Sequence, residues 1–121
     1  MPSKIIFVVD DEAVIADTLT VILRHSGFAA KAFYDPAEVL KAAELVVPDL
    51  VISDVVMPGM NGMELAKRIR SLYPPCRLFL FSGHAETRDT LKNAQSELDF
   101  EILQKPIHPS DLLARIRQKL E

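Results

Sequence analysis

Five polar side chains that could do chemistry stand at the ends of short apolar runs in the sequence. They are Asp10, Asp11, Asp54, Ser82 and Lys105. Short apolar runs bounded by turn residues are typical of strands buried on both faces of a parallel sheet. The carboxyl ends of such strands form the edge where parallel sheets bind ligands. We therefore expect these side chains to converge in one crevice although they are distant in sequence.

The expected crevice combines three carboxylates with one ammonium group, which leaves a net charge of −2 at neutral pH. One Mg²⁺ would neutralise this charge. Oxygen ligands with room for water suit Mg²⁺, which usually takes one or two carboxylates together with phosphate. Asp54 is therefore a candidate nucleophile or metal ligand. An isolated aspartate in a loop more often caps or decorates a turn, and only the other four positions favour the functional interpretation.

Elements that could position these residues alternate along the whole chain. Apolar runs predict strands, and apolar residues at helical spacing predict a helix after each strand. The predicted strands span residues 5–9, 28–33, 50–54, 78–81 and 100–104. This alternation predicts an α/β fold with a parallel sheet, right-handed crossovers and helices on both faces. A single domain is expected to span residues 1–121.

Capping residues mark several predicted helix ends. Asp35 before Pro36, and Asn61 three residues before Glu64, are N-terminal capping patterns, and Gly27 is a C-terminal stop.

Apolar stripes predict the buried helix faces. The first helix, between Glu12 and Ser26, is expected to bury Ile15, Leu19 and Ile22, widened by Val14, Val21 and Leu23. The third helix is expected to bury Leu65, Ala66, Ile69, Leu72 and Tyr73. Pro48 is expected to close the second helix, and a helix from about Glu86 to Leu98 has the thinnest stripe.

Composition restricts the class of protein. The chain has 121 residues, 49% hydrophobic and 26% charged, which is typical of one soluble globular domain. A net charge of −3 without a Lys/Arg run predicts no direct nucleic-acid partner and no membrane partner. No apolar stretch suits a membrane span and no signal-peptide layout is present, so a cytoplasmic location is expected. Cys76, the single cysteine, is expected in the core or at its rim.

At these positions the chain resembles the receiver domains of two-component response regulators. The resemblance covers the whole chain and rests on Asp10 and Asp11, the DVVMPGMNG loop at residues 54–62, Ser82, and the Lys105, Pro106 dipeptide. Each motif alone would be weak, but four in this order at predicted strand ends are specific. The resemblance implies a flavodoxin-like, doubly wound sheet of five parallel strands in the order 2-1-3-4-5, with five helices.

The resemblance also implies a magnesium site and a phosphoacceptor. Asp54 would accept a phosphoryl group from a histidine kinase, a phosphotransfer protein or a small phosphodonor. Mg²⁺ would be held by Asp10, Asp11, Asp54 and the backbone carbonyl of Val56, with Asp11 the direct ligand of the acidic pair.

The resemblance also implies that two further residues bind the phosphoryl group. Lys105, aimed by a cis bond to Pro106, would pair with a phosphoryl oxygen, and Ser82 would donate a hydrogen bond to another. Ile102 departs from the family pattern, since many members carry a Tyr or Phe there that rotates on activation. A coupled motion of Ser82 and an aromatic ring is therefore not expected in this chain.

The implied function is a phosphorylation-dependent signalling switch, a regulatory domain that assists its own phosphorylation and dephosphorylation. Its output surface would comprise the fourth helix, the fifth strand and the fifth helix, where a homodimer or merely a solvated charged face is expected. Two alternatives stay open. One is a free-standing phosphotransferase or hydrolase with Asp54 as nucleophile, although the short loops offer no substrate-recognition segment. The other is an interaction domain that is never phosphorylated. The sequence identifies neither the kinase, the pathway nor the output.

Overall fold

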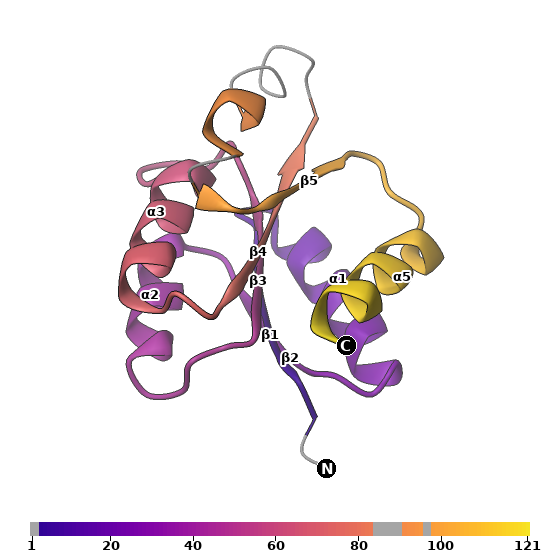
Figure 1. Ribbon diagram of the computed structural model, residues 1–121. Coiled ribbons are helices and arrows are strands. Elements are labelled where there is room, and N and C mark those ends of the chain that lie inside the picture. Colours follow the sequence, from indigo (N-terminus) through magenta and orange to yellow (C-terminus); the bar gives the residue numbers. More distant parts are fainter. Residues whose placement is uncertain (1–2, 84–90, 96–97) are drawn as a thin grey trace.

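Five parallel strands form the middle layer of the fold, in the order β2-β1-β3-β4-β5. They are β1 (Ile5–Val9), β2 (Ala29–Phe33), β3 (Leu50–Asp54), β4 (Arg77–Ser82) and β5 (Glu101–Gln104). The computed structural model describes residues 3–83, 91–95 and 98–121 (Figure 1). The strand order and the parallel pairing confirm the predicted doubly wound sheet. β2 lies at one edge, which accounts for the exposed Lys31 within it.

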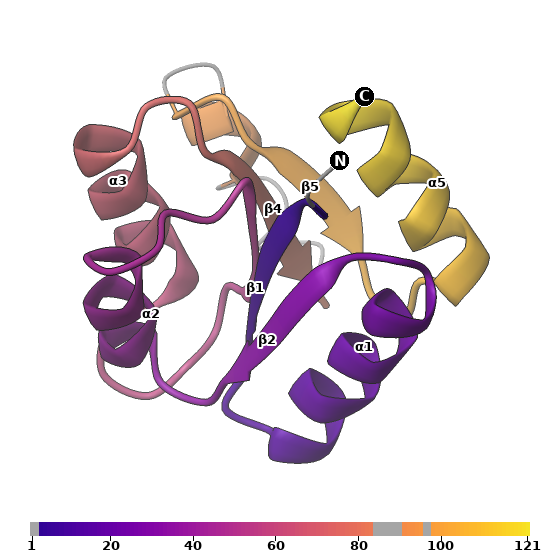
Figure 2. The ribbon, with the colours of Figure 1, turned by 90° about the horizontal axis from the view of Figure 1, so that it is seen from below.

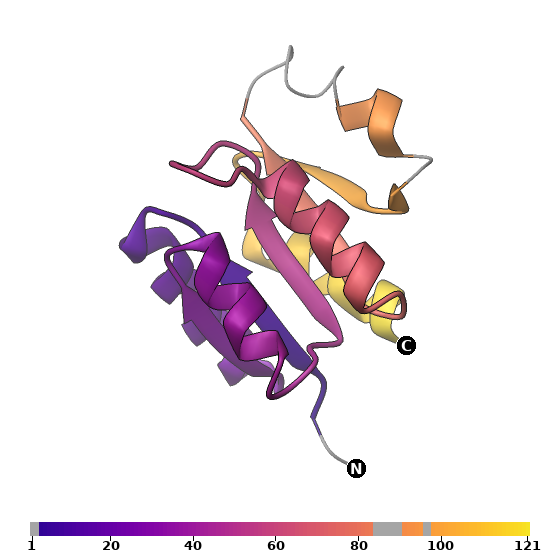
Figure 3. The same ribbon diagram turned by 90° about the vertical axis from the view of Figure 1, so that its left-hand side faces the viewer.

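Helices cover both faces of this sheet. They are α1 (Ala13–His25), α2 (Pro36–Ala43), α3 (Gly62–Leu72) and α5 (Pro109–Leu120). Figures 1 and 2 show α2 and α3 on one face and α1 and α5 on the other, and Figure 3 shows α2 and α3 from their outer side. None of the helices in the described part of the chain is both long and apolar enough to span a membrane.

The fourth predicted helix is described only in part. Residues 91–95 are helical, and Leu91, the first of them, is fully buried in the core. The remainder of the predicted helix falls mainly on residues 84–90 and 96–97, which lie outside the described residues, and His84 lies there too.

Local capping chemistry explains where α2 and α3 begin. The Asp35 side chain accepts a hydrogen bond from the Ala37 N–H at 3.0 Å, and Pro36 occupies the first turn. The Asn61 side chain accepts from the Glu64 N–H at 2.9 Å. Both bonds pair backbone donors that the first helical turn otherwise leaves without a partner. The capping patterns predicted for these two helices are therefore confirmed.

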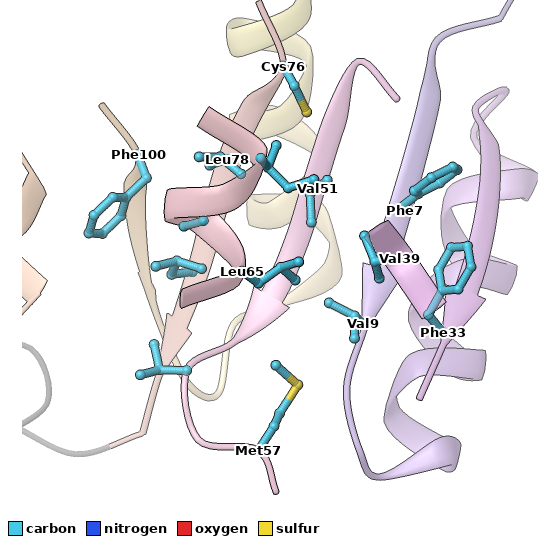
Figure 4. Close-up of a cluster of buried hydrophobic side chains, with 14 of the residues drawn as sticks. Phe7, Val9, Phe33, Val39, Val51, Met57, Leu65, Cys76, Leu78 and Phe100 are labelled. Carbon is cyan, nitrogen blue, oxygen red and sulfur yellow. The ribbon is translucent and has the colours of Figure 1, made fainter. Parts of the chain in front are cut away.

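The core consists of two layers, one on each face of the sheet, because alternate strand residues point to opposite faces. Phe7, Val9 and Val51 pack with α2 and α3, whereas Ile6 and Ile52 pack with α1 and α5. Figure 4 shows the first layer, in which the Phe7 and Phe33 rings lie 4.8 Å apart between centroids. Cys76 is buried in the same layer, as expected.

The buried face of α1 differs from the predicted one. Val14 and Val21 are 78% and 50% exposed, so their predicted burial is wrong. Leu23 is buried as predicted, but the other two buried residues of α1 are Ala16 and Thr20, which were not predicted. Small side chains let α1 approach the sheet, and the Thr20 hydroxyl donates to the Ala16 carbonyl at 2.8 Å, which satisfies its hydrogen-bonding capacity inside the core.

Two other predictions also fail, one about burial and one about the end of a helix. Leu72, in the last turn of α3, is 60% exposed. α2 ends at Ala43 rather than at Pro48, because the N–H groups of Leu45 and Val46 both turn back to the Ala42 carbonyl at 3.0 Å. This turn leaves the apolar side chains at residues 45–47 exposed.

Candidate acidic site at the carboxyl edge of the sheet

The five predicted site residues lie at the carboxyl ends of the strands. Asp10 directly follows β1, Asp54 ends β3, Ser82 ends β4 and Lys105 directly follows β5. Strand register aligns these ends, since Val9 pairs with Ser53, Asp54 with Phe81, and Ser82 with Gln104. The parallel sheet therefore brings together residues that are up to about one hundred positions apart in sequence.

The three aspartates form a compact cluster of oxygen atoms. One carboxylate oxygen from each of Asp10, Asp11 and Asp54 lies within 4.8 Å of the others. Asp10 is buried, Asp54 is half-buried and Asp11 is exposed, so the cluster has a protein side and a solvent side. A set of hard oxygen donors that is open to water on one side fits Mg²⁺, which keeps several waters when it binds to proteins.

Lys105 completes the crevice. Its Nζ donates a hydrogen bond to Asp54 Oδ2 at 2.8 Å and lies 3.5 Å from Asp10 Oδ2. The Lys105 to Pro106 peptide bond is cis, as the resemblance implied. The Lys105 N–H donates to the Ser82 carbonyl at 2.9 Å, which ties the ends of β4 and β5 together. Lys105 thereby contacts both Asp54 and Asp10 in the crevice.

Burial and neighbouring charges oppose each other at two of these groups. Burial raises the pKa of Asp10, while the Glu12 N–H and the Lys105 ammonium partly lower it. For Lys105, burial alone lowers the pKa, but the hydrogen bond and the charges of Asp54 and Asp10 together raise it above its ordinary value. Lys105 is therefore a cation at neutral pH. A cation bound beside the buried Asp10 carboxylate would offset the cost of burying its charge.

The backbone around Asp54 contains two residues whose roles the sequence analysis missed. Gly62, the first residue of α3, lies so close that an added Cβ would be 2.2 Å from the Asp54 backbone oxygen. Ser53 is 1% exposed, and its hydroxyl donates to that same oxygen at 2.8 Å. The available signals were a glycine in the first turn of a helix and a polar residue inside a buried apolar strand.

The structure also gives the positions of the remaining residues named in the site prediction. Ser82 is 1% exposed at the end of β4, beside the crevice. Val56 lies in the β3–α3 loop with a side chain that is 65% exposed, and the metal-binding role of its carbonyl stays a prediction. Ile102 packs on the rim of the core layer beneath α3.

The fold and the crevice together define a doubly wound α/β domain with a carboxylate cluster and a lysine at its strand exits. The chain belongs to the response regulator receiver domain family, because the family model of that description matches residues 6–117.

Relatives with sequence similarity include response regulators and transcriptional regulatory proteins. The DNA-binding response regulator MtrA of Mycobacterium tuberculosis is 34% identical over 115 residues, which are 95% of this chain and 50% of that protein. The transcriptional regulatory protein CreB of Escherichia coli is 33% identical over 120 residues, which are 99% of this chain and 52% of that protein. The chain thus spans about half the length of these curated relatives.

Solved structures with the same fold include receiver domains and response regulators. A CheY-like receiver domain protein from Methanospirillum hungatei has a TM-score of 0.88 and 28% identity, covering 98% of this chain and 94% of that chain. The chemotaxis response regulator CheY4 of Vibrio cholerae has a TM-score of 0.86 and 26% identity, covering 98% of this chain and 100% of that chain.

The description of MtrA as DNA-binding is at odds with the prediction that nucleic acid is not a direct partner. Because residues 6–117 match a receiver domain, that prediction concerns the receiver alone.

Proposed function

We propose that this chain is a phosphorylation-dependent signalling switch of a two-component system, in which Asp54 accepts a phosphoryl group from a histidine kinase or a phosphotransfer protein. Residues 1–121 form one receiver domain in this proposal. The domain is cytoplasmic and regulatory rather than a stand-alone enzyme.

The contacts of Asp54 support the proposal most strongly. Its carboxylate lies at the carboxyl end of β3 with the Lys105 ammonium 2.8 Å away and two further aspartates in the same cluster. The Lys105 ammonium and the carboxylates of Asp10 and Asp11 thus flank the half-buried carboxylate of Asp54. This arrangement suits phosphoryl transfer, in which positioning and charge neutralisation do most of the catalysis.

The metal would be Mg²⁺, held by Asp10, Asp11, Asp54 and the backbone carbonyl of Val56. When bound, it would offset the negative charge of the incoming phosphoryl group. The buried Asp10 would anchor the cation on the protein side, and the exposed Asp11 would leave its other side open to water and phosphate.

The transfer itself exchanges one bond to phosphorus for another. A carboxylate oxygen of Asp54 attacks phosphorus, the bond between phosphorus and the donor's histidine nitrogen breaks, and the electron pair stays on the imidazole. The Lys105 ammonium, already hydrogen-bonded at Asp54, then pairs with a phosphoryl oxygen. The Ser82 hydroxyl donates to a second phosphoryl oxygen. Hydrolysis by water releases inorganic phosphate and returns Asp54 to its carboxylate.

Intact-mass measurement tests this proposal. Incubation with phosphoramidate and Mg²⁺ should add one phosphoryl group to the parent chain and to Asp111→Asn, whose substituted residue is exposed on α5. Asp54→Asn should gain none. An equal adduct on Asp54→Asn would mean that another residue accepts the phosphoryl group and would contradict the assignment.

The proposed output surface comprises residues 91–95, β5 and α5. Within it, the Glu101 carboxylate pairs with Arg115 at 3.1 Å and with Lys119 at 3.4 Å in the same chain. These mixed charges could instead pair across a two-fold homodimer axis. Sedimentation with and without beryllium fluoride, which mimics a bound phosphoryl group, should show dimers only with the fluoride. A monomer in both states would favour a solvated charged face.

A further inference from the structure

Ser53 is a buried polar residue one position before Asp54. It is 1% exposed, and its neighbours across the sheet are Val9 of β1 and Leu80 of β4. Its Oγ donates a hydrogen bond to the Asp54 backbone oxygen at 2.8 Å. Burial of a hydroxyl is tolerated when it is hydrogen-bonded, but it gains little stability over an apolar side chain. The hydroxyl therefore requires an explanation other than core packing.

The backbone that follows Asp54 is held at several points. An added Cβ at Gly62 would lie 2.2 Å from the Asp54 oxygen, so α3 lies in close contact with this peptide group. The Gly62 N–H donates to the Val55 carbonyl at 2.8 Å, and the Val55 N–H donates to the Phe81 carbonyl at 3.2 Å. The Ser53 hydroxyl adds a bond to the peptide oxygen itself and so opposes rotation of this peptide plane.

We propose that the Ser53 hydroxyl is a positioning group for phosphorylation at Asp54. It fixes the plane of the peptide that joins Asp54 to Val55, and hence the angle between the Asp54 carboxylate and the backbone that runs on to Val56. This inference rests on the proposed function, because it gives Ser53 a role in presenting the acceptor carboxylate to Lys105 and to the donor.

The matched variants are Ser53→Ala, which removes the hydroxyl, and Ser53→Thr, which keeps it. Thr20→Val is the control, because the Thr20 hydroxyl is also buried and donates to a backbone carbonyl at 2.8 Å, but inside α1. Ser53→Ala should be phosphorylated by phosphoramidate about tenfold more slowly than the parent chain, since small misplacements of reacting groups are costly. Ser53→Thr and Thr20→Val should keep rates close to the parent's.

A second readout needs neither metal nor donor. In the metal-free chain, Ser53→Ala should shift the NMR signals of the Val55 and Val56 amides, and Thr20→Val should leave both in place. Rates and amide signals of Ser53→Ala that match the parent's would overturn the inference, and so would an equal loss of rate in Thr20→Val. A parent chain that is never phosphorylated would overturn the proposed function instead, and the amide signals alone would then decide the positioning role.

Discussion

Substitution of Gly62 by alanine tests the close packing that fixes Asp54. The added Cβ would lie 2.2 Å from the Asp54 backbone oxygen and 3.0 Å from the Val55 Cα. Ordinary contacts to a Cβ begin near 3.4 Å, so the start of α3 must move about 1 Å away from β3. Overpacking of this kind costs about 1–3 kcal/mol.

Two further effects partly cancel. The displacement weakens the hydrogen bond from the Gly62 N–H to the Val55 carbonyl, which contributes about 1 kcal/mol. Replacing glycine by alanine in a helix stabilises the folded state by about 0.5–1 kcal/mol. The net loss of unfolding free energy is therefore about 1–3 kcal/mol, a fall in Tm of roughly 4–12 °C for a domain of this size.

Thermal melting, together with phosphorylation of the folded chain, measures both consequences. Gly83→Ala is the matched control, because nothing lies within 4 Å of an added Cβ there. Gly62→Ala should melt well below the parent and should lose phosphorylation rate even at temperatures where it is folded. If its Tm fell no further than that of Gly83→Ala, the reasoning about this contact would be refuted.

Three other predictions concern the metal, the core and one arginine. Mg²⁺ at tenfold over its Kd should stabilise the parent by about 1.4 kcal/mol, and Asp11→Asn should lose this shift in a melting experiment. If Asp11→Asn kept the full shift, the metal would bind somewhere other than this cluster. Burial raises the pKa of the Cys76 thiol to about 12, so the thiol ionises first in the unfolded chain as pH rises above 9. Stability should therefore fall between pH 9 and 12, by about 1.4 kcal/mol at pH 10, and Cys76→Ala should lack this part of the loss in urea unfolding; an identical pH dependence in both chains would contradict it. The Arg70 guanidinium donates to the backbone carbonyls of Leu98, Pro74, Cys76 and Asp99. Arg70→Met should lower the unfolding free energy by about 2 kcal/mol, whereas Met at the exposed Arg68 on the same helix should change it little; equal effects would refute the anchoring role.

The sheet and its carboxyl edge were predictable because their signal lies in the order of residue types. Continuous apolar runs define buried strands, and parallel topology then forces Asp10, Asp54 and Lys105 to one edge whatever their separation in sequence. The helix caps at Asp35 and Asn61 were equally predictable from the sequence, since capping is a local interaction between a side chain and a nearby N–H.

The errors in helix burial concern interactions between elements, which periodicity does not encode. Val14 and Val21 belong to an apolar arc wider than the sheet can cover, and the small residues Ala16 and Thr20 decided which side of α1 is buried. The contacts of Ser53 and Gly62 with the Asp54 carbonyl involve backbone atoms, so residue type alone could not reveal them.

Phosphorylation at Asp54 itself is the central claim, and borohydride reduction followed by peptide mass mapping tests it most directly. The reagent reduces an aspartyl phosphate to homoserine and so marks the acceptor position permanently. After treatment with phosphoramidate and Mg²⁺, residue 54 should be recovered as homoserine, while Asp10 and Asp11 should be recovered unchanged. Homoserine at either of those two positions, or at none of the three, would contradict the account.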